Sequence, residues 1–210
     1  MTFQGFEAKD FDSFDIDGLE NRMEAIQSRI QPKFQEVGSY LTEELSMLLG
    51  KEMHLHIAKH ARRTKNPPQD TWLGIADNKR GYKKHPHFQV GLFDDHLFLW
   101  LAYIYEMPNK EQAANSFLKQ QPVFKELPGD FRISLDHTKK DSSLLQNMND
   151  EDLTKSLERF RDVKKGEFLI GRHLDRNDPI LRDGERFLEV AKETFTTLVP
   201  FYNMSYEQIG

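Results

Sequence analysis

HFQVGLFDDHLFLWLAYIY, residues 87–105, is the stretch that determines the fold class. It contains two runs of residues, HFQVGLF (87–93) and LFLWLAYIY (97–105). Both runs are rich in aromatic and branched residues, which favour strands. Asp94-Asp95-His96 between them is a plausible turn, so we expect an antiparallel hairpin. Periodicity alone leaves a buried helix over 97–105 open as the alternative.

Further strands are expected on both sides of this hairpin. Met53, Leu55 and Ile57 alternate with His54 and His56, which is the period of two typical of a strand. Other runs with strand character are TWLGIAD (71–77), FRISLDH (131–137) and FLIGRHL (168–174).

Helical periodicity surrounds the strands. Apolar residues recur every three or four positions over 19–30 and 34–48, and Gln31-Pro32 is expected to end or bend that helix. Similar patterns predict helices over 109–120 and 150–163, and closing helices between Asp178-Pro179 and Pro200. We therefore expect one α+β domain over 1–210, with a mostly antiparallel central sheet flanked by N- and C-terminal helices. Its parts are a helical region (1–50), a sheet-rich core (52–137), and helices with a last strand (150–200).

Composition excludes several kinds of chemistry. The 210 residues include no cysteine, so disulfides, thiolate nucleophiles, iron–sulfur clusters and cysteine zinc sites are absent. The chain has no P-loop, dinucleotide fingerprint, G-x-S-x-G, H-E-x-x-H or EF-hand loop, and we predict no cofactor. The acidic N-terminus does not resemble a signal peptide, and the longest apolar run has only nine residues (97–105). We expect a cytoplasmic protein.

The segment from His54 to His87 differs in charge from the rest of the chain. It holds eight Lys or Arg and two acids, so its net charge is +6, whereas the whole chain carries −5. Five of the eight histidines also lie in it. A positive field of this kind in an acidic protein predicts an anion site.

Three short motifs supply the candidate contacts. HIAKHARRTKNPPQDTW (56–72) places adjacent arginines beside a stiff Pro-Pro turn, which suits bidentate binding of phosphate or carboxylate. KRGYKKHPHFQVGLF (79–93) places a tyrosine among cations, and GRHLDRND (171–178) completes the pocket if its strand lies near the first. The predicted ligand-binding residues are Lys59, Arg62, Arg63, Lys65, Arg80, Tyr82, Lys83 and Arg172. His60 and His85 are the candidates for proton transfer. The alternative interpretation is a solvated sheet edge and a local salt-bridged turn.

The paired histidines raise the question of a metal. His54 and His56 have the same H-x-H spacing as His85 and His87, and four imidazoles can bind zinc. The surrounding positive charge repels a dication, so we predict no metal and keep these four only as candidate ligands.

The chain resembles the YktB-like family, uncharacterised cytoplasmic proteins of Bacillus-type bacteria that form a domain of unknown function. The resemblance spans nearly the whole chain and depends on four strings: DIDGLENRM (15–23), HIAKHARRTKNPPQDTW (56–72), KRGYKKHPHFQVGLF (79–93) and the IYE that ends at Glu106. It implies a compact α+β domain in a bacterial cytosol, and it supplies no activity and no catalytic residues.

The leading hypothesis is a domain, with or without enzymatic activity, that binds a small anionic or phosphorylated ligand. One alternative is an interaction module whose basic face docks on RNA or an acidic protein, although the acidic remainder argues against a broad nucleic-acid platform. The other is a metal-dependent hydrolase that uses the paired histidines. The oligomeric state stays open.

Overall fold

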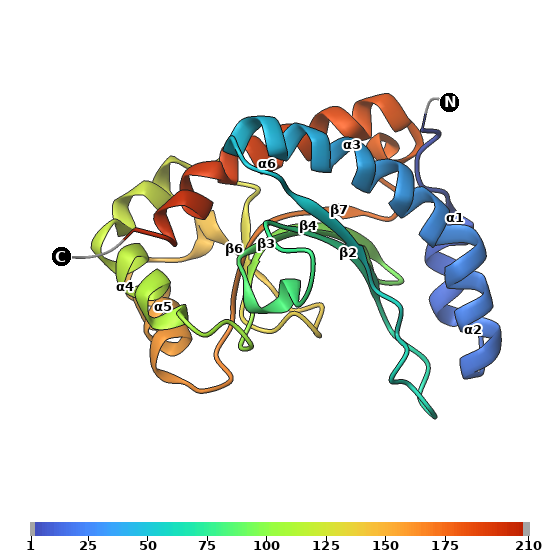
Figure 1. Ribbon diagram of the computed structural model, residues 1–210, viewed down its shortest axis with the longest axis horizontal. Coiled ribbons are helices and arrows are strands. Elements are labelled where there is room, and N and C mark those ends of the chain that lie inside the picture. Colours follow the sequence, from blue (N-terminus) through green and yellow to red (C-terminus); the bar gives the residue numbers. More distant parts are fainter. Residues whose placement is uncertain (1–2, 208–210) are drawn as a thin grey trace.

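Seven strands form one sheet in the order β1-β2-β3-β4-β7-β5-β6, and every neighbouring pair is antiparallel (Figure 1). The structure is a computed structural model that describes residues 3–207. The strands are β1 (His54–Ile57), β2 (Thr71–Ala76), β3 (His87–Leu92), β4 (His96–Tyr103), β5 (Arg132–Ser134), β6 (Ser143–Leu144) and β7 (Phe168–Asp175). The predicted α+β class is confirmed.

The stretch 87–105 forms the expected hairpin. Phe88 pairs with Leu101 and Leu92 with Leu97, and the N–H of Phe93 donates to the carbonyl of His96 at 2.9 Å across the turn. The alternative of a buried helix over 97–105 is therefore wrong. The strand predicted over 131–137 is shorter than expected, because only 132–134 pairs with β7 and the chain then turns away.

Helices lie at both ends of the chain, as predicted. They are α1 (Ala8–Phe11), α2 (Leu19–Ala25), α3 (Gln31–Leu49), α4 (Lys110–Lys119), α5 (Asp150–Asp162) and α6 (Gly184–Met204). Short helical turns are η1 (Asp12–Asp15), η2 (Ile26–Ile30), η3 (Tyr82–Lys84), η4 (Gln121–Glu126), η5 (Leu145–Asn147) and η6 (Pro179–Arg182). Within residues 3–207 no helix has the length and apolar character that crossing a membrane requires.

Two prolines have weaker effects on the helices than the sequence suggests. Before Pro32, the turn η2 has π-helical geometry, and this wider turn joins α2 to α3 without a break. Pro200 lies inside α6, which was expected to stop before it. The helix continues because Phe201, Tyr202 and Met204 beyond the proline are buried in the core, and this packing compensates for the lost hydrogen bond.

The core lies between the sheet and the two long helices, α3 and α6, which run across one face (Figure 1). Alternate strand residues such as Phe88, Leu99 and Ile170 point into it and are fully buried. Phe88 stacks on Tyr202 of α6, with ring centroids 5.4 Å apart. One face of the sheet thus packs against α3 and α6, and the other alternate residues point to the opposite face.

Candidate functional site

The sheet face turned away from α3 and α6, which we call the open face, is lined by the other alternate residue of each strand. Gln89 of β3 pairs with Trp100 of β4, and Gly91 pairs with Phe98. Trp72 of β2 pairs with Gly91 from the other side. Six buried residues form an apolar cluster of their own on this side: Phe93, Phe98, Trp100, Ala102, Ile104 and Leu169.

Glycines on three of these strands make room for large rings. A Cβ at Gly74 would lie 2.8 Å from Cε2 of Tyr82, and a Cβ at Gly91 would lie 2.6 Å from Cε2 of Phe98. At Gly171 a Cβ would meet the carbonyl of Leu99. Larger residues at these positions would fill the volume that the aromatic side chains occupy.

A pocket of about 330 Å³ opens at the β2 end of this face. It is lined by Arg63, Asn66, Pro67, Gln69, Asp70, Trp72 and Thr138. Its walls therefore come from the loop between β1 and β2, from β2 itself and from the loop that follows β5.

Asp70 is the unusual group of this pocket. The residue is only 6% exposed; its carboxyl hydrogen-bonds to its own backbone, and within residues 3–207 it forms no ion pair with another residue. Burial raises the pKa of Asp70 to about 6, although electrostatic interactions with His137, Arg63 and Lys83 act in the opposite direction. Burying a carboxyl normally costs free energy, so its position in a pocket makes Asp70 a candidate for binding.

Trp72 brings two loops together. Its Nε1–H donates to the Tyr82 hydroxyl at 2.8 Å, and the Lys83 ammonium lies 5.2 Å from the centroid of its ring. His60, which has a positive φ of 49°, meets the same ring edge-on and lies 3.0 Å from the Thr71 hydroxyl through Nε2. Burial, with the charges of Arg63 and Lys83, lowers the pKa of His60 to about 4, so it is neutral at pH 7.

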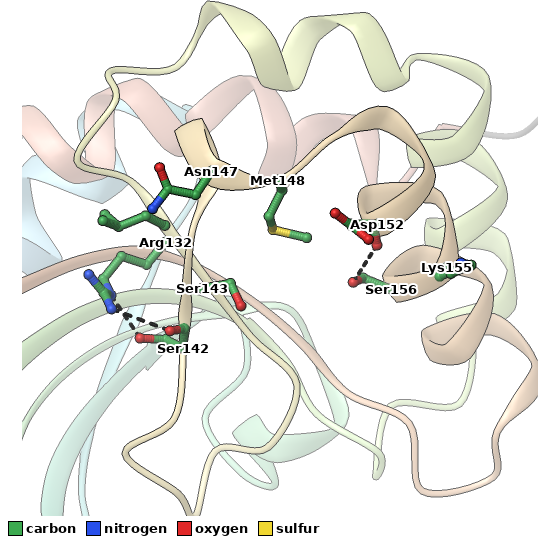
Figure 2. Close-up of a pocket in the computed structure, with 9 residues that line it drawn as sticks. Arg132, Ser142, Ser143, Asn147, Met148, Asp152, Lys155 and Ser156 are labelled. Carbon is green, nitrogen blue, oxygen red and sulfur yellow. Dashed lines mark hydrogen bonds between the residues drawn. The ribbon is translucent and has the colours of Figure 1, made fainter.

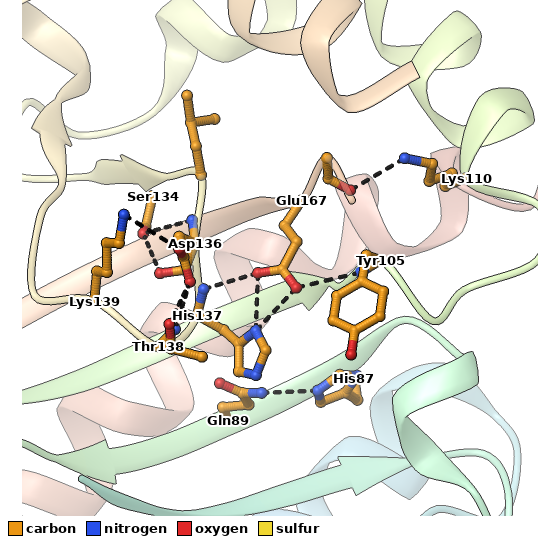
Figure 3. Close-up of polar contacts among 12 residues, drawn as sticks. His87, Gln89, Tyr105, Lys110, Ser134, Asp136, His137, Thr138, Lys139 and Glu167 are labelled. Carbon is orange, nitrogen blue, oxygen red and sulfur yellow. Dashed lines mark hydrogen bonds and ion pairs between the residues drawn. The ribbon is translucent and has the colours of Figure 1, made fainter. Parts of the chain in front are cut away.

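A histidine–carboxylate pair borders the pocket (Figure 3). The backbone N–H and the Nδ1 of His137 both lie 2.8 Å from Oε2 of Glu167, which is 3% exposed. The N–H of Tyr105 donates to Oε1 of the same carboxylate at 3.4 Å. The His137 ring meets Trp72 edge-on, with centroids 6.2 Å apart. With Nδ1–H donating to the carboxylate, Nε2 of the neutral ring is the acceptor.

His87 is held in a single tautomer in the middle of the open face. Its Nδ1–H donates to the carbonyl of His85 at 2.8 Å, so Nε2 accepts from the side-chain amide of Gln89 at 2.8 Å (Figure 3). Complete burial lowers the pKa of His87 to about 3. The ring is therefore a neutral hydrogen-bonding group at physiological pH.

Within residues 3–207, the grouping of three possible metal ligands is Asp136, His137 and Glu167, whose ligand atoms lie within 4.8 Å of one another. Their oxygens already accept hydrogen bonds. Both Glu167 oxygens face N–H groups of His137, and Oδ1 of Asp136 accepts from the N–H and the hydroxyl of Thr138. This donor set fits hydrogen-bonded carboxylates better than a metal centre.

A larger hollow of about 550 Å³ lies between β5, β6 and α5 (Figure 2). Its lining is polar, and the guanidinium of Arg132 is already bound to Ser142 through Nε at 2.8 Å. Asp152, which also lines it, caps its own helix with Asn149. Lys155 of this hollow also binds Glu151 at 2.6 Å, so its charged groups are already engaged, and we base the candidate site on the pocket at Asp70, a buried carboxyl that forms no ion pair within residues 3–207.

Sequence comparison places the chain among known proteins. The model of a family described as "Domain of unknown function (DUF1054)" matches residues 6–202. The chain belongs to this family. It is 58% identical over 206 residues to the UPF0637 protein ABC2405 of Shouchella clausii, covering 98% of this chain and 96% of that protein. It is 56% identical to OB1420 of Oceanobacillus iheyensis, covering 97% of each chain, and 52% identical to a UPF0637 protein of Listeria monocytogenes, covering 99% and 100%. The predicted uncharacterised Bacillus-type family is confirmed.

The DUF1054 chain brings only some of the predicted ligand contacts to the pocket. Arg63 lines it, while Tyr82 and Lys83 contact Trp72. Four predicted residues lie on exposed parts of the same two loops, and within residues 3–207 their side chains make no hydrogen bond or ion pair; they are Lys59, Arg62, Lys65 and Arg80. These four stay predictions.

Arg172 lies on the opposite face. It pairs across the sheet with Leu99, binds Asp130 at 2.5 Å and reaches Thr194 of α6 at 3.4 Å. The segment 171–176 therefore does not join the loops at 56–66 and 79–87 around one pocket. The alternation of β7 is the reason, since a neighbour of a residue on the open face points into the core.

The predicted histidines have separate surroundings. His85 lies 3.6 Å from Asp77, away from His60 at the pocket. Of the four metal candidates, His56 stacks on Tyr82 with centroids 4.8 Å apart, and Tyr82 meets His87 on its other side at 5.0 Å. The tyrosine thus stands between the two histidine pairs. His54 lies near Glu52, with 3.9 Å between Nδ1 and Oε1.

Four residues of this region were not predicted from the sequence: Asp70, Gln89, His137 and Glu167. The sequence could have pointed to Gln89, because it is the one amide in the strand predicted over 87–93. The sequence could also have pointed to Asp70, because it is one of two acids in the basic segment from His54 to His87. His137 follows β5 and Glu167 precedes β7. The two residues are thirty positions apart, and no local spacing links them.

Proposed function

We propose that this protein binds a small phosphorylated ligand in the pocket at Asp70, with Arg63 and Lys83 supplying the positive charge. One observation carries the proposal: cations from two separate loops lie at this pocket, Arg63 in its lining and Lys83 over the ring of Trp72, which forms a wall. Arg63 comes from the loop between β1 and β2, and Lys83 from the turn η3. Such convergence favours an anion over a diffuse basic surface.

Asp70 and Trp72 specify the ligand further. In its neutral form the Asp70 carboxyl donates a hydrogen bond to a phosphate oxygen, and the anion in turn favours the neutral form. Trp72 offers an aromatic edge to a flat group attached to the phosphate. A phosphorylated metabolite, such as a nucleotide, combines these properties. The volume of about 330 Å³ suits a ligand of this size.

The test is a thermal-shift screen with nucleoside monophosphates, sugar phosphates and inorganic phosphate, followed by calorimetry of the compounds that stabilise the protein. Arg63→Ala and Lys83→Ala are each expected to weaken binding about tenfold, the usual effect of losing one charge-assisted contact. Arg62→Ala is the matched control, because it removes the same charge from the same loop outside the pocket lining. Its affinity should change by less than about twofold.

Two outcomes would contradict the proposal. No stabilisation by any phosphorylated compound would leave the pocket without the proposed ligand class. An equal loss of affinity in Arg62→Ala and Arg63→Ala would instead indicate a diffuse basic face, as expected of an interaction module.

A further inference from the structure

The His137–Glu167 pair has the arrangement of a general base and its orienting carboxylate. Glu167 fixes the ring through Nδ1 and also binds the backbone N–H of His137, so both the tautomer and the ring position are set. Within residues 3–207, Nε2 of His137 makes no hydrogen bond. A lone pair held ready in this way is available to accept a proton.

This base borders the proposed ligand pocket. Thr138, the next residue, lines the pocket, and the His137 ring contacts the Trp72 wall at 6.2 Å between centroids. Asp70 precedes Trp72 by two residues on the same side of the chain and lines the pocket as well. The carboxyl is buried, and it interacts electrostatically with His137, Arg63 and Lys83. A base and an acid thus lie at one pocket together with two cations.

We infer that this pocket hydrolyses a phosphodiester, with His137 as general base and Asp70 as general acid. The inference rests on the proposed anion site. Nε2 of His137 takes a proton from water while the water oxygen bonds to phosphorus. The bond from phosphorus to the leaving oxygen breaks, and the Asp70 carboxyl gives its proton to that oxygen. The products are a phosphomonoester and an alcohol, and the proton on His137 returns to Asp70 through solvent.

The charges at the site favour a diester over a monoester. A diester carries one negative charge, so water attacks it more readily than a dianionic monoester. Its alkoxide leaving group also needs a proton, which the buried Asp70 can supply. Arg63 and Lys83 face the charge that develops on the phosphoryl oxygens.

The experiment compares two diesters with the full-length chain: bis(p-nitrophenyl) phosphate, whose nitrophenolate leaves without a proton, and the deoxydinucleotide TpT, whose alkoxide needs one. His137→Gln should lose at least about 100-fold in rate on both diesters. Asp70→Asn should lose about 100-fold on TpT and less than about tenfold on the nitrophenyl ester. His54→Gln, a histidine of the edge strand β1 that does not line the pocket, should keep the wild-type rate.

Each failure has a separate meaning. If calorimetry shows that TpT binds but neither diester is hydrolysed above background, the catalytic inference is overturned and the binding proposal stands. If no phosphate compound binds, the proposed function fails first. Should His137→Gln unfold, Asp70→Asn decides alone, because it keeps the size of the side chain: equal losses on both diesters would overturn the assignment of Asp70.

Discussion

The imidazole rings of His96 and His173 stack on neighbouring strands, with centroids 4.0 Å apart and planes 23° from parallel. They lie on the open face, where His173 also meets Trp100 edge-on. Burial, the charge of His96 and that of Arg132 lower the pKa of His173 to about 2. Two stacked imidazoles in such a place are stable only when they are neutral.

This stack predicts a loss of stability in acid. Unfolded His173 takes up a proton below its ordinary pKa of about 6.5, whereas the folded protein resists protonation until about pH 2. The contribution of His173 to stability is therefore complete above pH 6.5 and declines as the pH falls through this window. His173→Phe keeps a ring and removes the titration. Urea unfolding at pH 7, 6 and 5 should give a shallower pH dependence in this variant, and an unchanged slope would contradict the prediction.

The effect of Asp70 on stability depends on pH in the opposite direction. Its pKa is raised from 3.8 to about 6 in the folded protein, so between these values the folded state holds the proton more tightly than the unfolded state. The ionised carboxyl then destabilises the fold above pH 6. Asp70→Asn should raise the free energy of unfolding at pH 7 by on the order of 2 kcal/mol, with little gain at pH 4. Urea unfolding at the two pH values measures this, and an equal change at both would contradict it.

Gly171 predicts a large steric effect. An added Cβ would meet the carbonyl of Leu99 and lie 3.0 Å from Cε3 of Trp100, and β7 cannot move without breaking its pairing with β4. Gly171→Ala should therefore cost about 3 kcal/mol. Gly81→Ala is the control, because nothing lies within 4 Å of its Cβ and only the positive φ of 70° adds a cost, about 1 kcal/mol. Thermal melting compares the two, and similar losses would argue against the steric explanation.

The two tryptophans make ligand binding visible by fluorescence. Trp72 and Trp100 are the only tryptophans of the chain, and only Trp72 lines the pocket. A ligand beside Trp72 changes the surroundings of its indole, so emission should change on binding in the wild type and in Trp100→Phe. Trp72→Phe should show no comparable change. A signal that persists in Trp72→Phe would place the ligand elsewhere.

The elements of the fold were predictable because each has a periodic pattern of its own. The helices at both ends needed only the spacing of apolar residues, whereas the hairpin at 87–105 also needed its strand-forming residue types and the turn at Asp94-Asp95-His96. The length of α6 was not predictable in this way, because burial of Phe201 and Tyr202 beyond Pro200 depends on tertiary packing. Local pattern therefore determined the types of element better than their ends.

The site was only partly predictable, because its chemistry is non-local. The loops with Arg63 and Lys83 were found from their charge, and these two cations do approach Trp72 or its pocket. The pairing of His137 with Glu167 depends on the adjacency of β5 and β7, which no spacing in the chain reveals. Arg172 was assigned to the pocket on charge alone, and the register of β7 with β4 places it on the other face.

Side chains of β3 and β4 alternate between the core and the open face, and this alternation has a practical consequence for mutagenesis. Gln89 and Trp100 lie on the open face, and their sequence neighbours Val90 and Leu99 belong to the core. A library that varies only the positions on the open face would therefore sample ligand preference while leaving the packing against α3 and α6 unchanged. Ligand preference and packing against α3 and α6 would then depend on separate residues, although these residues alternate along the same strands.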